Sequence, residues 1–193
     1  MTTTQTTTNL EQLQYPIGRF APKEDYSIEE VNRMIGLQET APARYQKLLA
    51  GRSDEDLART YREGSWTVQQ LVHHIADIQL LNFLRLKKAL TEDDYVITLV
   101  QMNDWAKTPD ATTAPIDDSL LMFDGITRRF VYLWRTLDEQ TQTKTYYHPS
   151  RQINLSLKQF LYMATWHVVH HQGHIELALG LQPSAFLGDG LSR

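Results

Sequence analysis

Four of the seven histidines lie in one apolar stretch that runs from Phe160 to Leu181. These four are His167, His170, His171 and His174. A residue on an α-helix returns to nearly the same face after four positions, so the stretch contains two candidate pairs, His167 with His171 and His170 with His174. Buried polar nitrogens without partners cost several kcal/mol. Imidazoles that face the core therefore require carboxylates, carbonyls, water or a metal ion beside them.

A further histidine pair, His73 and His74, follows the sequence Thr67-Val68-Gln69-Gln70. In a helix from Thr67 to about Leu90, one seam has steps of three and four residues and contains Leu71, His74, Ile78, Leu81 and Arg85. His73 lies about 100° away from that seam. We therefore expect His74, and not His73, to face the core.

Three inward imidazoles, His74 and one pair from the last helix, are enough to hold a divalent ion and leave coordination positions open. Such an ion acts as a Lewis acid that lowers the pKa of a bound water, or it binds a substrate thiol as thiolate. Spacing alone does not distinguish this site from histidines that hydrogen-bond within the core. Spacing also leaves open which of the two pairs takes part; if His170 and His174 do, His167 and His171 are interpreted as hydrogen-bonding residues, with proton shuttling as the alternative.

The sequence argues against a zinc protease, because the residue after His170 is His171 and the His-Glu-x-x-His motif is absent. A general base would be Asp77, a free histidine or the activated water itself. Asp77 could also orient a ligand imidazole; the alternative is an ordinary exposed acid. Arg85 could bind an anionic group of a substrate, although an arginine at a bundle end that extends its head to solvent is the more common case.

Length, charge and cysteine content exclude several classes of protein. The 193 residues suit one domain, which we place at 15–193 after a flexible tail at 1–14. The net charge of −4 provides no basic patch for nucleic acid and no polybasic segment for a membrane. With no cysteine, disulfides and thiolate-bound zinc are excluded, and the composition fits a cytoplasmic protein.

Helix caps and apolar periodicity predict an all-α protein with four long helices. Their starts are marked by Ser27 with Glu30, Thr67 with Gln70, Asp117 with Asp118, and Ser156 with Gln159. Pro42 should kink or interrupt the first helix. Residues 96–105 could form a short helix within a long connection, and residues 141–154 a loop or a small hairpin. The segment from Tyr15 to Pro22 should be extended over the body.

Several motifs occur in order along nearly the whole chain after the tail. They are YPIG at 15–18, YREGSWTVQQLVHHIAD at 61–77, LTE at 90–92, YHP at 147–149 and WHVVHHQGHI at 166–175. In these motifs the chain resembles the YfiT branch of the DinB superfamily. One departure is Ser65, where the family pattern has glycine before the tryptophan.

The resemblance implies a four-helix bundle with up-down-down-up connectivity, assembled as a homodimer. It also implies a divalent ion, zinc or nickel, on His74, His170 and His174. Members of this branch are described as metal-dependent hydrolases, and relatives in the superfamily are S-transferases that use a low-molecular-weight thiol such as bacillithiol. We therefore expect an enzyme of one of these two kinds acting on a small molecule. The alternative is a non-catalytic metal-binding or interaction bundle.

Overall fold

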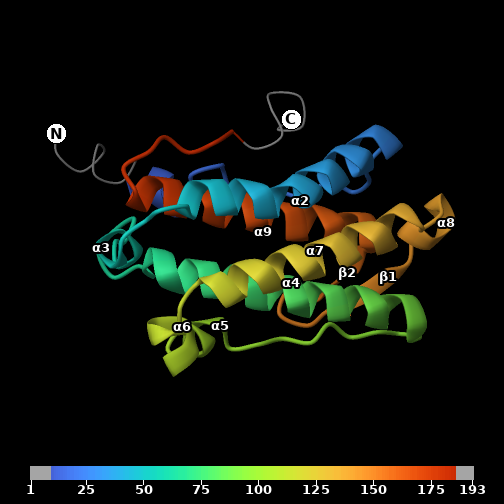
Figure 1. The fold of residues 1–193 in the computed structure, drawn as a ribbon. Helices are drawn as coiled ribbons and strands as arrows, with labels where there is room; N and C mark the ends of the chain where they lie inside the picture. The colour runs from blue at the N-terminus through green and yellow to red at the C-terminus, as the bar shows by residue number, and fades with distance from the viewer. Residues whose placement is uncertain (1–9, 186–193) are drawn as a thin grey trace, which may run out of the picture.

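The computed structural model describes residues 10–185, and four long helices dominate it (Figure 1). These are α2 (Ile28–Leu49), α4 (Val68–Thr91), α7 (Asp117–Arg135) and α9 (Leu157–Ala178). Three of them begin at a complete capping box, in which the side chain of the cap and that of the third helical residue each accept a backbone N–H. The fourth, α7, has no side-chain cap, and Asp117 and Asp118 place negative charge in its first turn.

The helices have the predicted up-down-down-up connectivity. In Figure 1, α2 and α9 run in one direction along the bundle, and α4 and α7 run in the other. Each of α4 and α2 packs against both α7 and α9. The long connection at 92–116 returns the chain to the end of the bundle where α4 began, so that α7 lies parallel to α4.

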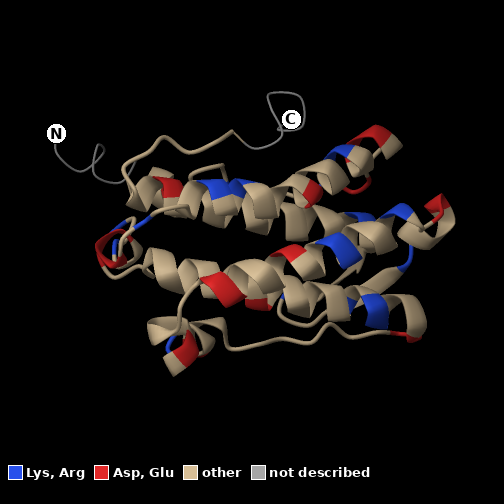
Figure 2. Cartoon of the chain, in the orientation of Figure 1, with Lys and Arg blue, Asp and Glu red and all other residues tan. Residues whose placement is uncertain are grey.

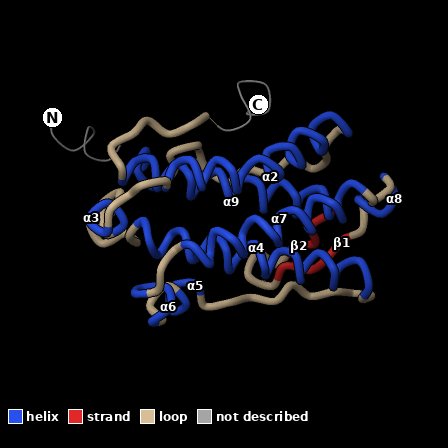
Figure 3. Tube along the Cα trace, in the orientation of Figure 1, coloured by secondary structure: helices blue, strands red, loops and turns tan. Residues whose placement is uncertain are grey.

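Short elements fill the connections, and Figure 3 shows how little of the chain is strand. They are α3 (Asp54–Leu57), α5 (Met102–Trp105), α6 (Pro109–Thr113), α8 (Glu139–Gln142), β1 (Thr145–His148) and β2 (Ile153–Ser156). The strands form an antiparallel hairpin in the register Thr145 to Ser156 and His148 to Ile153. Residues 145–156 thus form a hairpin, which was one of the two forms predicted for 141–154, and residues 141–142 end α8.

Two local predictions need correction. Only residues 102–105 of the possible helix at 96–105 are helical, because Val96 instead forms a parallel bridge with Tyr147. Of the two effects predicted for Pro42, a kink or an interruption, the interruption does not occur, since α2 continues to Leu49 with Pro42 inside it.

Part of the predicted tail is ordered against α9. Of the predicted tail at 1–14, residues 10–14 are helical, and residues 1–9 lie outside the described part of the chain. The next segment was predicted to be extended; it turns at 16–17, where the N–H of Gly18 donates to the carbonyl of Tyr15 at 3.0 Å. It then follows α9, and the indole Nε1 of Trp166 donates to the carbonyl of Gly18 at 3.2 Å. This segment covers a face of α9 that would otherwise meet solvent.

Buried side chains connect the helices along the bundle. One core cluster surrounds Phe130, Trp134 and Phe160, and another surrounds Tyr45 and Phe123. The hydroxyl of Tyr45 donates to the carbonyl of Val168 at 2.7 Å, which fixes α2 against the histidine-bearing part of α9.

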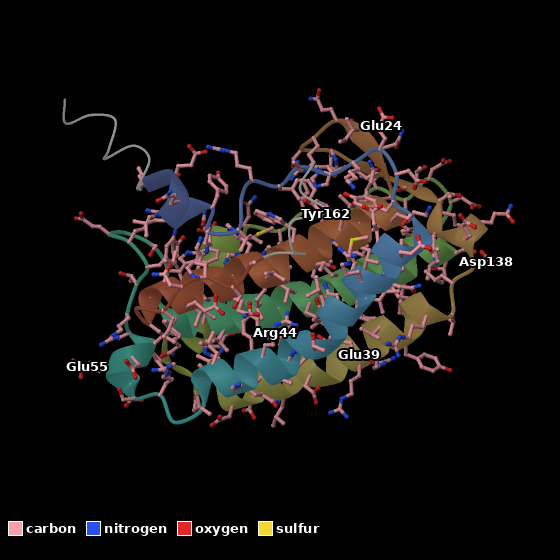
Figure 4. All side chains as sticks on the ribbon, turned by 90° about the horizontal axis from the view of Figure 1, so that it is seen from above. Glu24, Glu39, Arg44, Glu55, Asp138 and Tyr162 are labelled. Carbon is pink, nitrogen blue, oxygen red and sulfur yellow. The ribbon has the colours of Figure 1, made fainter. Side chains whose placement is uncertain are left out.

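Polar contacts on α2 reinforce this packing on both sides. Arg44, labelled in Figure 4, donates from Nε to Gln172 of α9 at 2.9 Å. Glu39, labelled in the same view, accepts from Arg135 of α7 at 2.6 Å. Both neighbours of α2 are therefore held by a charged side chain as well as by the core.

Charged residues of both signs are interspersed over the bundle, and the visible face has no large area of one sign (Figure 2). None of the helices in residues 10–185 has the length and apolar character needed to cross a membrane.

Candidate metal centre

His74 of α4 and His167 of α9 face each other across the contact between these helices. Their Nε2 atoms lie 3.1 Å apart. One ring nitrogen from each of His74, His167 and His171 lies within 4.8 Å of the other two. Two nitrogen ligands of a tetrahedral zinc ion, each about 2.1 Å from the metal, are about 3.4 Å apart. His74 and His167 therefore have about this spacing, and His171 lies near enough for the three to form a group that could hold a divalent ion.

The hydrogen bonds of His171 indicate which of its nitrogens is free. Nε2 of His174 lies 3.2 Å from the carbonyl oxygen of Gln14, which can only accept, so Nε2 donates and Nδ1 of a neutral His174 is an acceptor. Nδ1 of His171 lies 3.3 Å from that Nδ1 and donates to it. In a neutral His171 the proton is then on Nδ1, and Nε2 is available to bind a cation.

Burial keeps these rings neutral. It lowers the pKa of His74 to about 4. Burial, and then the neighbouring histidines, hold the pKa of His167 and of His171 well below the ordinary value. Neutral imidazole is the form that binds a metal, so the group needs to lose no proton at pH 7.

The structure places the predicted ligands in two groups. His74 is buried and faces α9, as predicted from its seam. His170 and His174 join His171 in a second group of nitrogens within 4.8 Å, and in residues 10–185 no such group joins His74 to either of them. The predicted set His74, His170 and His174 thus draws members from both groups and stays a prediction, and His74, His167 and His171 form the group that joins α4 to α9.

The rotation of α9 about its axis separates the two groups. His170 stacks on Trp166, with ring centroids 4.2 Å apart, and lies near Tyr15 of the N-terminal segment. His174 stacks on Tyr61 at 3.9 Å. These two rings thus face the segments that cover α9, whereas His167 faces α4.

Asp77, the candidate for orienting a ligand, is half-buried on α4. Within the described residues no hydrogen bond joins it to His73 or His74, and burial raises its pKa. His73 is also buried, because the 109–119 region covers it: its ring nitrogens lie 2.8 Å from Ser119 Oγ and 3.1 Å from the carbonyl of Ala114. The predicted role of Asp77 therefore has no supporting contact.

Two cavities reach the histidines from different sides. A cavity of about 340 Å³ is lined by His170, His171 and His174 together with Tyr61, Arg62 and Trp66. A cavity of about 600 Å³ is lined by His167, Arg85, His148 and Trp166, among others. His148, the last residue of β1, lies at this second cavity. The candidate ligands His171 and His167 are thus each accessible to a small molecule, through separate cavities.

Gly173 allows the N-terminal segment to approach α9 closely beside this site. A Cβ atom at Gly173 would lie 2.9 Å from Cγ and 3.2 Å from Cβ of Pro16. We expect Gly173→Ala to displace Pro16 and weaken the hydrogen bond between His174 and Gln14. Overpacking of this kind destabilises a protein by about 1–3 kcal/mol, which urea denaturation would measure.

Gly36 supplies the matched control, since a Cβ there meets nothing within 4 Å and the residue lies inside α2. Gly36→Ala should stabilise the protein by up to about 1 kcal/mol through helix propensity. Equal effects of the two substitutions would contradict the close approach at Gly173.

Comparison with known proteins gives concordant matches. The family model described as the DinB superfamily matches residues 38–175. A relative from Oceanobacillus iheyensis, named as a candidate metal-dependent hydrolase, is 37% identical over 169 residues, which are 86% of this chain and 95% of that protein. A Bacillus subtilis relative of the same description, YfiT, is 34% identical over 84% of this chain and 92% of its own length.

Solved structures agree in fold. That of YfiT from Bacillus subtilis, described as a probable metal-dependent hydrolase with an unusual four-helix bundle topology, superimposes with a TM-score of 0.84 at 32% identity, covering 88% of this chain and 99% of that one. A mycothiol-dependent maleylpyruvate isomerase superimposes with a TM-score of 0.61 at 17% identity, over 82% of this chain and 63% of that one. The second likeness extends to the fold alone.

Proposed function

Because this chain belongs to the DinB superfamily, we propose that it is a metal-dependent hydrolase whose divalent ion, zinc or nickel, is held by His74, His167 and His171. The observation that supports this most directly is the 3.1 Å separation of the Nε2 atoms of His74 and His167, two buried or partly buried rings from different helices. The curated relatives, named as candidate metal-dependent hydrolases, support the reaction class.

Each of the three imidazoles has its own part in binding the ion. His74 and His167 would supply Nε2 atoms from α4 and α9, and the hydrogen bond from His171 to His174 holds the ring of His171 and leaves its Nε2 free to bind the ion. Three protein ligands leave a coordination position open, which is the arrangement of catalytic sites. When bound, the ion supplies Lewis acidity that lowers the pKa of a water or a thiol.

A second candidate function is transfer of a low-molecular-weight thiol. Two separate cavities reach the proposed ligands, one at His171 and one at His167. A hydrolase requires one organic substrate and water, whereas a thiol transferase must admit two organic molecules to one ion. The second cavity is the observation that favours this alternative.

Two assays on protein purified without a histidine tag distinguish the reactions. A hydrolase should cleave p-nitrophenyl acetate in the zinc-loaded or nickel-loaded form and lose that activity on chelation. A transferase should instead consume 1-chloro-2,4-dinitrobenzene only when bacillithiol or cysteine is added. If neither loaded form turns over more substrate than the His167→Ala variant in either assay, the proposal of an enzyme is wrong.

Removal of the ion should lower stability without unfolding the bundle. A ligand present at about 1,000 times its dissociation constant stabilises the folded state by about 4 kcal/mol, and at this chain length each kcal/mol shifts Tm by about 2–4 °C. We therefore expect chelation to lower Tm by about 8–16 °C, while the circular dichroism of the helices at 20 °C is retained.

The two core clusters, which do not depend on an ion, are the reason that the helices remain folded. A non-catalytic ion that braces the helices would give a different result. Loss of helical circular dichroism on chelation at 20 °C would favour that alternative.

A further inference from the structure

The larger cavity lies beside His167 and has an uneven distribution of charge. Its walls come from α4, from the connection after it, from the β1–β2 turn and from the first half of α9. Two arginines, Arg85 and Arg151, and two histidines, His148 and His167, line it. Among residues 10–185, no aspartate or glutamate lines this cavity. The cavity is therefore electropositive in a protein whose net charge is −4.

Arg85 is the fixed cation of this cavity. It is only 6% exposed, and no carboxylate in residues 10–185 lies within ion-pair distance of it. Its guanidinium is held in place by neutral acceptors: Nε donates to the carbonyl of Thr98 at 3.1 Å, Nη2 donates to the same oxygen, and Nη1 donates to Asn82 Oδ1 at 3.3 Å.

These three hydrogen bonds use three of the five N–H groups of an arginine. A buried charge without a counter-ion is costly, and a protein normally pairs it. Here the guanidinium is oriented by the fold and still has donors to offer. Nδ1 of His148, in the same cavity, is also buried and has no hydrogen-bond partner among the described residues.

Beside the polar residues Asn82, Gln101 and Ser150, the rest of the lining is apolar. Ile78, Leu99, Met163 and the rings of Phe20 and Trp166 contribute to the same walls. A volume of about 600 Å³ is within the range of small-molecule sites. The occupant that matches this surface has an apolar body and one negatively charged end. A carboxylate suits that end, because guanidinium and carboxylate are both planar and pair through parallel hydrogen bonds.

We propose that this cavity binds the substrate, and that the substrate is a small organic carboxylate whose anionic end pairs with Arg85 while its apolar body lies towards Trp166 and His167. This inference rests on the proposed function, because His167 is one of the proposed metal ligands. It adds the substrate class and a specificity residue, Arg85, to that site. Sequence reasoning favoured an ordinary bundle-end arginine here, which the burial of Arg85 contradicts.

Binding of matched acids and amides by chelator-treated protein tests the proposal independently of metal chemistry. The probes are phenylacetate, 3-phenylpropionate and 4-phenylbutyrate, each compared with its neutral amide by isothermal titration calorimetry. We expect at least one acid to bind about tenfold or more tightly than its amide, since hydrogen bonds to charged groups are the stronger ones. If no acid of the three is preferred to its amide, the proposal is overturned, whatever the metal assays give.

Variants locate the preference. Arg85→Met should remove it, so that acid and amide bind equally, and Arg62→Met, a control in the smaller cavity, should retain it. An acid preference that survives in folded Arg85→Met would overturn the assignment to Arg85. Should that variant fail to fold, titration of the wild-type protein with the preferred acid gives the answer by NMR: the side-chain Nε resonance of Arg85 should shift, and an unchanged resonance would contradict the proposal.

Discussion

Replacing His167 by alanine is expected to lower the affinity for zinc or nickel by more than about 100-fold, since loss of a residue that only orients a metal ligand already costs about 10–100-fold. His167 belongs to the group that contains His74 and is absent from the group formed by His170, His171 and His174. His170 is its matched counterpart, because it belongs only to the second group. Its replacement by alanine should change the affinity by less than about tenfold.

Competitive titration of tag-free protein against a chromophoric chelator, with elemental analysis of the bound metal, measures both variants. His174→Ala should lie between them, at about a tenfold loss, because His174 acts through its hydrogen bond to His171. Circular dichroism establishes that each variant is folded. If the His170 variant loses the metal and the His167 variant retains it, the ligands are His74, His170 and His174, as the resemblance implies, and the set with His167 and His171 is wrong.

The helices were predictable because their starts are encoded locally. A serine or threonine followed three residues later by glutamate or glutamine satisfies two backbone donors at once, and the pairs Ser27–Glu30, Thr67–Gln70 and Ser156–Gln159 do this. The inward position of His74 followed from periodicity for a similar reason: its helix carries a seam that faces the core. Membership of the DinB superfamily, inferred from the motifs, is confirmed by the family match.

The choice of ligand pair on α9 could not be made from its sequence. When a helix has a single apolar stripe, its sequence shows which side faces the core. The sequence of α9 has no such single stripe, because the N-terminal segment covers a face that would otherwise be exposed to solvent and α9 is buried on nearly all sides. His167 and His170 are three residues apart, and both lie in an apolar context. The tertiary contacts, His174 with Gln14 and His167 with His74, are what gives the two pairs different surroundings.

The burial of His73 by the connection between α4 and α7 was also not predictable from the sequence. Sequence periodicity placed His73 on a flank of α4, yet the chain from α6 to the start of α7 returns over that flank and buries it. Such burial depends on contacts between residues about 40 positions apart, which no local pattern records. The homodimer implied by the resemblance stays a prediction, for which light scattering of the purified protein is the direct measurement.

Trp134→Ala is expected to have the largest effect on stability. Trp134 of α7 is fully buried, with its ring centroid 6.2 Å from that of Phe130, in a cluster that also contains Phe160. Truncation of a buried tryptophan to alanine costs about 3–5 kcal/mol. At about 2–4 °C per kcal/mol for a chain of this size, Tm should fall by about 6–20 °C. Thermal and urea denaturation of the metal-free protein would measure both quantities without a contribution from ligand binding.

Trp134→Phe is the control that separates packing from hydrogen bonding. The indole Nε1 is buried without a partner among the described residues, and an unpaired buried donor costs about 1–3 kcal/mol. Phenylalanine removes that donor and keeps most of the apolar contact, so its loss of stability should be less than half that of alanine. If phenylalanine is as harmful as alanine, then the indole nitrogen contributes a stabilising interaction. Because Trp134 lies on α7, and the proposed ligands lie on α4 and α9, folded Trp134→Ala should still bind zinc or nickel as the wild type does.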